Sequence, residues 1–581
     1  MRRYWVVALA VLTLLGVLSP PAFAQAPAPK VTINGLIDTV TYWARNVSHE
    51  DRDFSKNDDN LWYSRNRGRF DIIGEVGKAK GVLGIELDVA WGVTAQFQAH
   101  PGSLTTPTSG TGGGSAAIPS FINQSFGAGN DTNDLFEVKW LYVEFPMPLV
   151  PVPTIMRLGG QTCANYTYKL AILSFTDCPG VALETTWTPA VKTNLAFMQF
   201  DEMGVGITGR RTANQTPFRR GDDFFIWVSG EVTPMKGLDV QPLYVYALFK
   251  DQVLGSGNNS SAALPARGGV TLSQLMCGSF VGVTAAAVDS FASPRGRCME
   301  ERHYLGVDAR WRMGPWSLDP TFIYQTGQRD VAQSTAKSGI GGGRVVTQDE
   351  YAWIVDVRGG YRVGPLNLEG FFVYSPGNSA EDNIGTAPGR LKAVKYYQPL
   401  NNDIAYGSGG GLSEFLNLNS IDYFRGFAVG TSMFEGGSIG FDRYGRWDIG
   451  FKPSYAVTPA LTVRGLVAGH WTAESVDKNA HFNAATGLFP APRGSQDRNS
   501  NYLGTEFNLG LTWAFAPGLR LDAGAGWLSP GGAVERCRGG NTATAPGLQD
   551  QIVTVETPCT DGHSSNLQDA YWSGARVRFT F

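Results

Sequence analysis

The stretch Tyr502–Phe515, with the sequence YLGTEFNLGLTWAF, decides the fold class. Its polarity changes at nearly every residue, so an apolar set alternates with a polar or small set: Leu503, Phe507, Leu509, Leu511, Trp513 and Phe515 against Glu506, Asn508, Gly510 and Thr512. Successive side chains of a β-strand point to opposite faces, so this pattern predicts a strand with one apolar and one polar face. One such strand also fits a soluble β-sandwich, and the number of repeats therefore decides between the two.

The same alternation recurs along the chain, for example in Gly81–Trp91 and Trp447–Val457. Tight turns marked by proline separate some of these segments: Thr188-Pro189, Thr233-Pro234, Gly314-Pro315, Gly364-Pro365, Thr458-Pro459 and Ala516-Pro517. Longer polar connections separate others, near residues 93–134, 162–179, 202–221, 250–301, 327–349, 376–445, 473–501 and 530–566. This asymmetry predicts an all-β transmembrane antiparallel barrel of about 18 strands (range about 16–20), with short periplasmic turns and long extracellular loops.

The N-terminus has the features of a secretory signal peptide. Arg2 and Arg3 precede an apolar run that ends at Val17, and an A-x-A sequence ends at Ala24. That run is shorter than the roughly 20 residues that a membrane-crossing helix needs. We therefore expect a cleaved signal peptide at residues 1–24, a short leader at 25–30 and a single barrel domain at 31–581.

The composition favours a membrane barrel and argues against a nucleic-acid partner. The 581 residues include 72 Gly, 32 Phe, 21 Tyr and 15 Trp, and only 17% are charged. Glycine and aromatic residues in excess, with alternating polarity, are typical of a barrel whose outer face contacts lipid. The formal net charge of −3 provides no basic excess for nucleic acid, so no such partner is expected.

The last strand carries the most specific pattern. Alternate residues from Tyr571 to the terminal Phe581 are apolar or small, in the sequence YWSGARVRFTF. In this the chain resembles bacterial outer-membrane porins, whose final strand ends in Phe, and the run MRLGGQ at Met156–Gln161 is similar to a segment common in porin strands. The resemblance implies contact with outer-membrane lipid and recognition by the barrel-assembly machinery through Tyr571, Val577, Phe579 and Phe581. Monomeric and homotrimeric barrels share this alternation, so the oligomeric state stays open.

The six cysteines fall two by two into three of the long connections. Among the many pairings that six cysteines allow, a single one keeps every bridge within its own connection. It predicts the disulfides Cys163–Cys178, Cys277–Cys298 and Cys537–Cys559, which need an oxidising compartment and so agree with export. The spacing lacks CxxC pairs and nearby histidines, so no metal site is expected. A disulfide-braced loop could also fold inward and narrow the pore.

The polar faces predict the surface of a water-filled lumen. In the second strand the charged residues fall opposite Phe70, Ile72 and Val76, and a charge on the lipid face near the midplane would cost about 2–4 kcal/mol. The residues expected to line the pore are Arg65, Arg67, Arg69, Asp71, Glu75, Glu86, Asp88, Arg310, Arg312, Arg358, Arg362, Arg464, Arg576 and Arg578.

Two interpretations of these charges stay open. In the first, hairpin folding pairs them across strands, and the expected neighbours are Arg69 with Asp88, Asp71 with Glu86, Arg310 with Asp319, and Arg358 with Glu369. The three arginine–acid neighbours carry opposite charges, which stabilise a sheet at such positions, whereas Asp71 and Glu86 carry the same charge. In the second, the local excess of Arg65, Arg67 and Arg69 attracts anionic solutes, as rings of charge do in pores.

The sequence shows no constellation for catalysis or for a cofactor. Of the histidines, His470 alone falls well inside a predicted strand, with no serine or carboxylate clearly paired to it, so an enzyme is not expected. Too few residues lie between Ala24 and Val31 for a folded plug. We therefore predict a porin for passive diffusion of small hydrophilic solutes. Two alternatives stay open: a channel or exporter for acidic polysaccharide, similar to alginate-export barrels, and a non-conducting surface barrel that acts as an adhesin or scaffold.

Overall fold

The computed structural model describes residues 28–46, 60–91, 136–163, 166–169, 172–175, 177–201, 223–249, 300–333, 344–377, 393–402, 445–476, 500–532 and 568–581. The predicted signal peptide lies outside these residues, as do Cys277, Cys298, Cys537 and Cys559. Within the described ranges, no helix is long and apolar enough to cross a membrane.

Eighteen long strands of the described residues form one antiparallel sheet: β1 (Lys30–Arg45), β2 (Asn60–Val76), β3 (Ala79–Ala90), β4 (Phe136–Pro146), β5 (Thr154–Thr162), β7 (Asp177–Thr188), β8 (Val191–Asp201), β9 (Asp223–Met235), β10 (Leu238–Phe249), β11 (Glu300–Met313), β12 (Trp316–Gln333), β13 (Arg344–Val363), β14 (Leu366–Ser375), β17 (Arg446–Thr458), β18 (Leu461–Val476), β19 (Ser500–Ala516), β20 (Leu519–Pro530) and β21 (Ala570–Thr580). The described residues also form three strands of two residues each: β6 (Ser174–Phe175), β15 (Ala393–Val394) and β16 (Asn401–Asn402).

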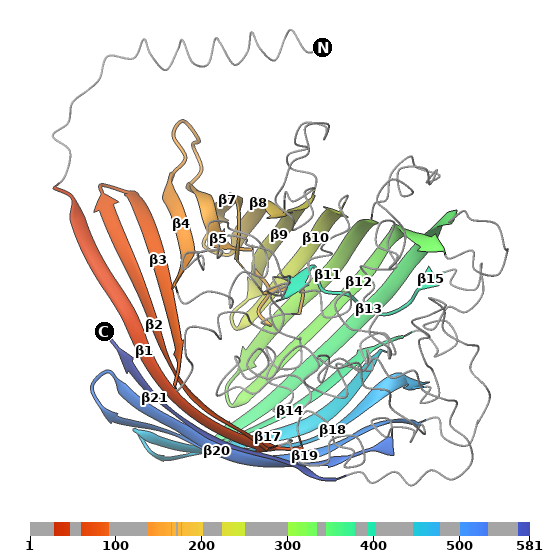
Figure 1. Ribbon diagram of the computed structural model, residues 1–581. Helices are drawn as coiled ribbons and strands as arrows, with labels where there is room; N and C mark the ends of the chain where they lie inside the picture. Colours follow the sequence, from red (N-terminus) through yellow and green to blue (C-terminus); the bar gives the residue numbers. More distant parts are fainter. Residues whose placement is uncertain are drawn as a thin grey trace, which may run out of the picture.

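The sheet closes into a barrel (Figure 1). Each long strand pairs with the next one in the chain, including β5 with β7 and β14 with β17. The first and last strands then pair with each other, from Leu36 opposite Thr580 to Arg45 opposite Tyr571. The predicted antiparallel barrel and its strand number are therefore confirmed.

The alternating polarity corresponds to the two faces of this barrel. In β17, the outward side chains of Ile449, Phe451 and Tyr455 are 49%, 44% and 49% exposed, whereas Asp448, next to Ile449, is buried in the interior. Apolar side chains that face outward on every side are typical of a barrel surrounded by lipid. Leu503 departs from its predicted place on the apolar face. It lies at a register irregularity between β18 and β19 and is buried.

Two hairpins differ in detail from the prediction. The β2–β3 turn consists of Gly77 and Lys78, where Gly77 has a φ of 63° that favours glycine. The predicted neighbours correspond to a four-residue turn, Gly77–Lys80, so the two-residue turn moves each of them by two positions. Arg69 therefore lies opposite Glu86 and not Asp88, and Asp71 lies opposite Gly84 and not Glu86. In the β9–β10 hairpin the turn falls at residues 236–237 and not at the predicted Thr233-Pro234. Pro234 belongs to β9, and a register irregularity near the end of β9 takes up the extra residues.

Candidate functional site

Part of the inner wall of β7–β10 is apolar, unlike the charged inner wall elsewhere. The buried apolar side chains there are Ala182, Ala196, Met198, Phe225, Trp227, Leu243, Val245, Ala247 and Phe249. Ile172 and Leu173, from the connection between β5 and β7, are fully buried in the same apolar cluster, and Tyr166 packs edge-on against Trp227 at 5.7 Å between ring centroids. Burying this apolar surface stabilises the connection inside the barrel. We call its described residues, 166–169 and 172–175, the first inner segment.

A disulfide joins two cysteines that flank the first inner segment. Cys163 directly follows β5, and Cys178 belongs to β7; both are buried, and their Cα atoms lie 5.1 Å apart. This pair was one of the three predicted disulfides and is confirmed. The other two pairs lie outside the described residues.

Residues 393–402, which we call the second inner segment, pack against the first. The Tyr397 hydroxyl donates to the Ile172 carbonyl at 2.8 Å, and the Leu400 amide donates to the Leu173 carbonyl at 2.8 Å. The strands β6 and β16 also pair in parallel. The two segments therefore form one unit inside the barrel, although they belong to connections more than 200 residues apart in the chain.

The second inner segment is bonded to the barrel wall through Gln398. Its amide group accepts a hydrogen bond from Arg302 at 2.7 Å, and its backbone N–H donates to Gln325 at 2.8 Å. Its backbone carbonyl accepts from the Tyr304 hydroxyl at 2.8 Å. Arg302 is itself buried and forms an ion pair with Glu300. Buried polar groups with partners of this kind hold a chain in one position.

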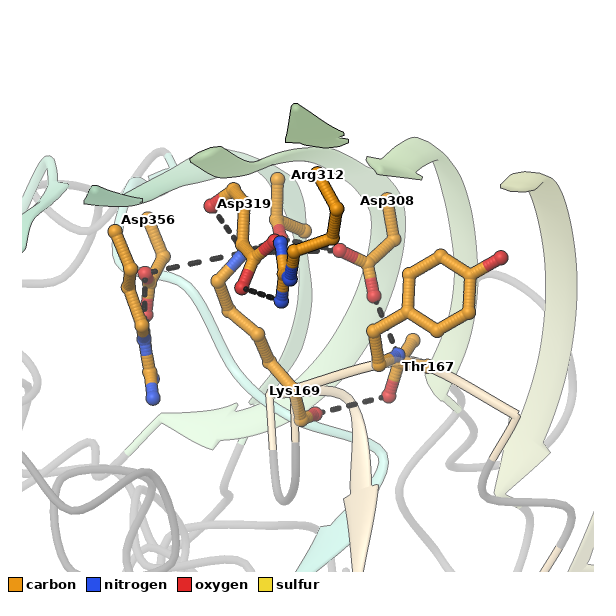
Figure 2. A network of polar contacts seen from close by, with 9 residues as sticks. Thr167, Lys169, Asp308, Arg312, Asp319 and Asp356 are labelled. Carbon is orange, nitrogen blue, oxygen red and sulfur yellow. Dashed lines mark hydrogen bonds and ion pairs between the residues drawn. The ribbon is translucent and has the colours of Figure 1, made fainter. Parts of the chain in front are cut away.

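Lys169 bonds the first inner segment to three strands of the wall, β11, β12 and β13 (Figure 2). Its ammonium group donates to the Asp319 carbonyl at 2.8 Å and to the Thr321 hydroxyl. It lies 3.6 Å from Asp308 Oδ1 and 4.0 Å from Asp356 Oδ1, and both carboxylates are fully buried. Burial lowers the pKa of Lys169, and the two carboxylates act in the opposite direction. Lys169 is thus a cation shared by two buried carboxylates, those of Asp308 and Asp356.

Tyr168 adds two contacts beside this cluster. Its backbone N–H donates to Asp308 Oδ2 at 2.6 Å, and its ring lies 4.3 Å from the Arg310 guanidinium carbon. A guanidinium over an aromatic face is attracted by the ring quadrupole. Arg310 is thereby held at the edge of the first inner segment while its side chain stays 43% exposed.

Elsewhere on the inner wall, two cations often share one buried carboxylate. Glu86 accepts ion pairs from Arg67 and Arg69, and the side chain of Glu86 is 1% exposed against 27% for Arg69. Asp522 is shared by Arg520 and Arg576 and is 6% exposed against 40% for Arg520. Glu144 is shared by Lys80 and Arg157 in the same manner. The guanidinium and ammonium groups therefore cover the carboxylates and face the interior space.

Apart from Asp88, the predicted pore-lining residues belong to inward-facing positions, but they differ in exposure. Arg65 and Arg67 are nearly buried, so of the three arginines singled out in β2 only Arg69 presents a sizeable surface. Asp71 and Glu75 lie on the same face of β2, opposite Asn34 and Lys30 in the β1–β2 ladder. Three more of the predicted arginines donate hydrogen bonds on the inner wall: Arg464 to Thr512, Arg576 to Asp522 and Arg578 to Asp38. Arg362 is exposed. The side chain of Asp88 lies outside the described part of the chain.

Two further predicted ion pairs are wrong, because an inward side chain can reach a partner on either neighbouring strand or on its own strand. Arg310 bonds Asp239, directly opposite on β10, at 2.8 Å, and Asp319 accepts Arg312 instead. Arg358 bonds Asp356 on its own strand at 2.9 Å. Its predicted partner Glu369 lies opposite Gly360 on one side and opposite Lys452 on the other, and it pairs with Lys452 at 3.4 Å.

His470 also differs from the prediction that no carboxylate accompanies it. Its Nδ1 lies 2.8 Å from Asp448 Oδ1, and its Nε2 lies 3.7 Å from Glu506 Oε2. The neighbouring strands β17 and β19 supply these two acids, which are as buried as the histidine. Within the part of the chain that the structure describes, no group of three or more histidine, cysteine, aspartate and glutamate side chains is arranged to hold a metal ion.

The sequence contains a signal for the inner segments that we did not use. In β9 the run Phe224–Val228, FFIWV, is apolar on both faces, and a strand buried on both faces reads as such a continuous run. In a barrel this means that the inner wall is covered at that point. Lys169 and Arg302 carry no comparable signal, because their partners lie on strands far along the chain.

No protein-family model matches the chain, and no curated protein is similar to it in sequence. Among solved structures, OccK8 (OprE) of Pseudomonas aeruginosa is similar with a TM-score of 0.41 at 11% identity, over 95% of this chain and 98% of that one. OccK9 (OpdG) of the same species has a TM-score of 0.44 at 9% identity, over 95% of this chain and 98% of that one. OccAB1 of Acinetobacter baumannii has a TM-score of 0.42 at 11% identity, over 95% of this chain and 96% of that one. Similarity at this level says nothing about what this chain transports.

Proposed function

We propose that this protein is an outer-membrane channel for small hydrophilic solutes and that it prefers anions. Residues 1–24 direct export, the apolar outer face contacts lipid, and solutes pass through the water-filled interior beside the two inner segments. A barrel of eighteen strands is wide enough for an aqueous channel. The inner segments occupy part of that width along the wall from β7 to β13 and narrow the path.

The observation that carries the anion preference is the burial of the carboxylates beneath the cations. Asp522, Glu86 and Asp38 are each at most 6% exposed, whereas their partners Arg520, Arg69 and Arg578 are 40%, 27% and 25% exposed. A permeating ion therefore meets the positive group of each pair first. Exposed charges act on ions mainly within a Debye length, about 8 Å at physiological ionic strength, so the groups at the surface of the lumen dominate.

The first prediction concerns the purified wild-type protein in a planar lipid bilayer. We expect steady ohmic current and, in a KCl gradient, a reversal potential whose sign shows that chloride is more permeant than potassium. A cation-selective reversal potential would contradict the anion preference and leave the channel intact. Absence of current under every condition that preserves the folded barrel would contradict the channel itself, and block by uronate oligomers would indicate a polysaccharide path.

A second prediction concerns the last residue, for which we propose a role in recognition by the barrel-assembly machinery. Phe581 forms two backbone hydrogen bonds with Gly35, at 3.0 and 3.1 Å, and its ring lies 6.0 Å from that of Phe70. Phe581→Ala keeps both backbone bonds and removes only the ring. We expect it to lower the yield of assembled barrel in cells several-fold, whereas Phe581→Tyr keeps the wild-type yield. Equal yields of folded, heat-modifiable protein from both variants would show that the ring is dispensable for assembly.

A further inference from the structure

We infer that Lys169 and the Cys163–Cys178 disulfide are two separate restraints that position the first inner segment and thereby set the width of the channel. The inference rests on the proposed function, because it assigns a determinant to the same path. It names Lys169 as a positioning residue, which acts through the segment that carries it.

The first inner segment has little backbone pairing of its own with the barrel. Its only strand within the described residues, β6, is two residues long and pairs with β16 of the second inner segment. The long strands, by contrast, are held by ladders of up to eighteen paired positions. The position of the first inner segment therefore depends on side-chain contacts and on the covalent bridge at its base.

The disulfide restrains the base of the segment. In the β5–β7 ladder the last paired positions are Gln161 with Cys178 and Thr162 with Asp177. Cys163 is the next residue after that ladder, and its bond to Cys178 keeps the chain closed where the backbone pairing ends. The bridge spans 15 positions of sequence, which limits how far the residues between can move apart. It does not fix the direction in which they point.

Lys169 supplies that direction. It lies six positions beyond Cys163, yet it contacts β11, β12 and β13, which are separated from β5 by the four strands β7 to β10. The side chain thus ties the segment to a distant part of the wall. Its removal would leave the buried Asp308 without its ion-pair cation, whereas Asp356 keeps Arg358 at 2.9 Å. An uncompensated buried charge is strongly unfavourable. The segment and the wall would then separate to admit water.

The test begins with Lys169→Met, which keeps the length of the side chain and removes the ammonium group. We expect single-channel conductance to rise about twofold as the inner segment leaves the path. Lys452→Met is the matched control: Lys452 is also an interior lysine paired with a carboxylate, Glu369, and its removal changes the lumen charge equally. The control variant is expected not to raise the conductance above that of the wild type.

The disulfide is tested in combination with Lys169. Cys163→Ser with Cys178→Ser should raise conductance less than Lys169→Met does, because Lys169 still holds the segment. All three substitutions together should raise it by more than the product of the separate effects. The combination of Lys169→Met with Asp308→Asn removes the uncompensated charge and should return conductance toward wild type, which a purely steric role for Lys169 would not produce.

A labelling measurement keeps the inference testable whether or not current is seen. Ser174 is buried in the first inner segment, and its hydroxyl donates to the Cys163 carbonyl at 3.1 Å. In folded barrels, Ser174→Cys should react with a water-soluble maleimide about tenfold faster when Lys169→Met is present, since opening by about 1.4 kcal/mol is a tenfold change in population. Equal rates with and without Lys169→Met, or equal conductance of Lys169→Met and Lys452→Met, would overturn the inference. A wild-type barrel without current but with Lys169-dependent labelling would contradict the channel and still support the role of Lys169 in positioning the first inner segment.

Discussion

The variant with Arg157→Glu, Arg312→Glu and Arg520→Glu should prefer cations, reversing the sign of the reversal potential. These three side chains are 37%, 51% and 40% exposed on the inner wall, and none of them contacts an inner segment in the described structure. A unit charge about 4 Å from a permeating ion is worth about 1 kcal/mol even in water. Three reversals should therefore change the anion-to-cation permeability ratio by about tenfold or more, to be measured in a KCl gradient.

The matched control for this variant replaces the same three arginines with lysine. Lysine keeps the charge and loses the planar, two-pronged contact with a carboxylate. We expect the lysine variant to keep the anion preference, so that charge and geometry are separated. If the glutamate variant retained the wild-type reversal potential, the described inner wall would not be the part of the protein that selects ions.

Ile37→Arg should destabilise the barrel in a lipid bilayer by about 2–4 kcal/mol, because a charge on the lipid face near the midplane carries that cost. Ile37 lies near the middle of β1 and is 41% exposed on the outer face. The quantity to measure is the free energy of unfolding from phospholipid vesicles in a denaturant titration. Channel selectivity is expected to stay as in the wild type, since the new charge does not face the lumen.

Asn34→Arg is the control on the same strand. Asn34 faces the interior opposite Asp71, so a new guanidinium there meets water and a carboxylate. Its effect on stability should lie within about 1 kcal/mol, the range of an exposed ion pair. Similar losses for Ile37→Arg and Asn34→Arg would show that the two faces of β1 do not meet different solvents, and the membrane assignment would then fail.

The barrel was predictable because its signal is local. Alternation at single-residue spacing assigns each side chain of β17 or β19 to a face without knowledge of the neighbouring strand. Where the prediction failed, the backbone departs from strict alternation. Leu503 falls at a register irregularity, and two residues fewer in the turn at Gly77 moved every partner of β2 along β3.

The ion partners were less predictable, because each inward side chain lies between two strands. Arg310 could reach Asp319 on β12 or Asp239 on β10, and the register places it directly opposite Asp239. A hairpin predicted from the sequence shows only the strand that is next in the chain. The strand on the other side and the direction of the side chain are known only from the closed sheet.

By itself, the sequence determined that this chain forms an antiparallel barrel of about eighteen strands with an apolar outer face, and it determined the Cys163–Cys178 pairing, because each depends on spacing along a short stretch. Only the tertiary structure decided that residues 166–169 and 172–175 lie inside the barrel and that Lys169 reaches Asp308 and Asp356. It also decided that arginines cover the carboxylates of Glu86, Asp522 and Asp38. Tyr168 and Lys169 bond residues 140 and 150 positions away along the chain, and no local pattern encodes such a distance. Such contacts arise when the sheet closes and encloses a space in which a buried charge must find its partner.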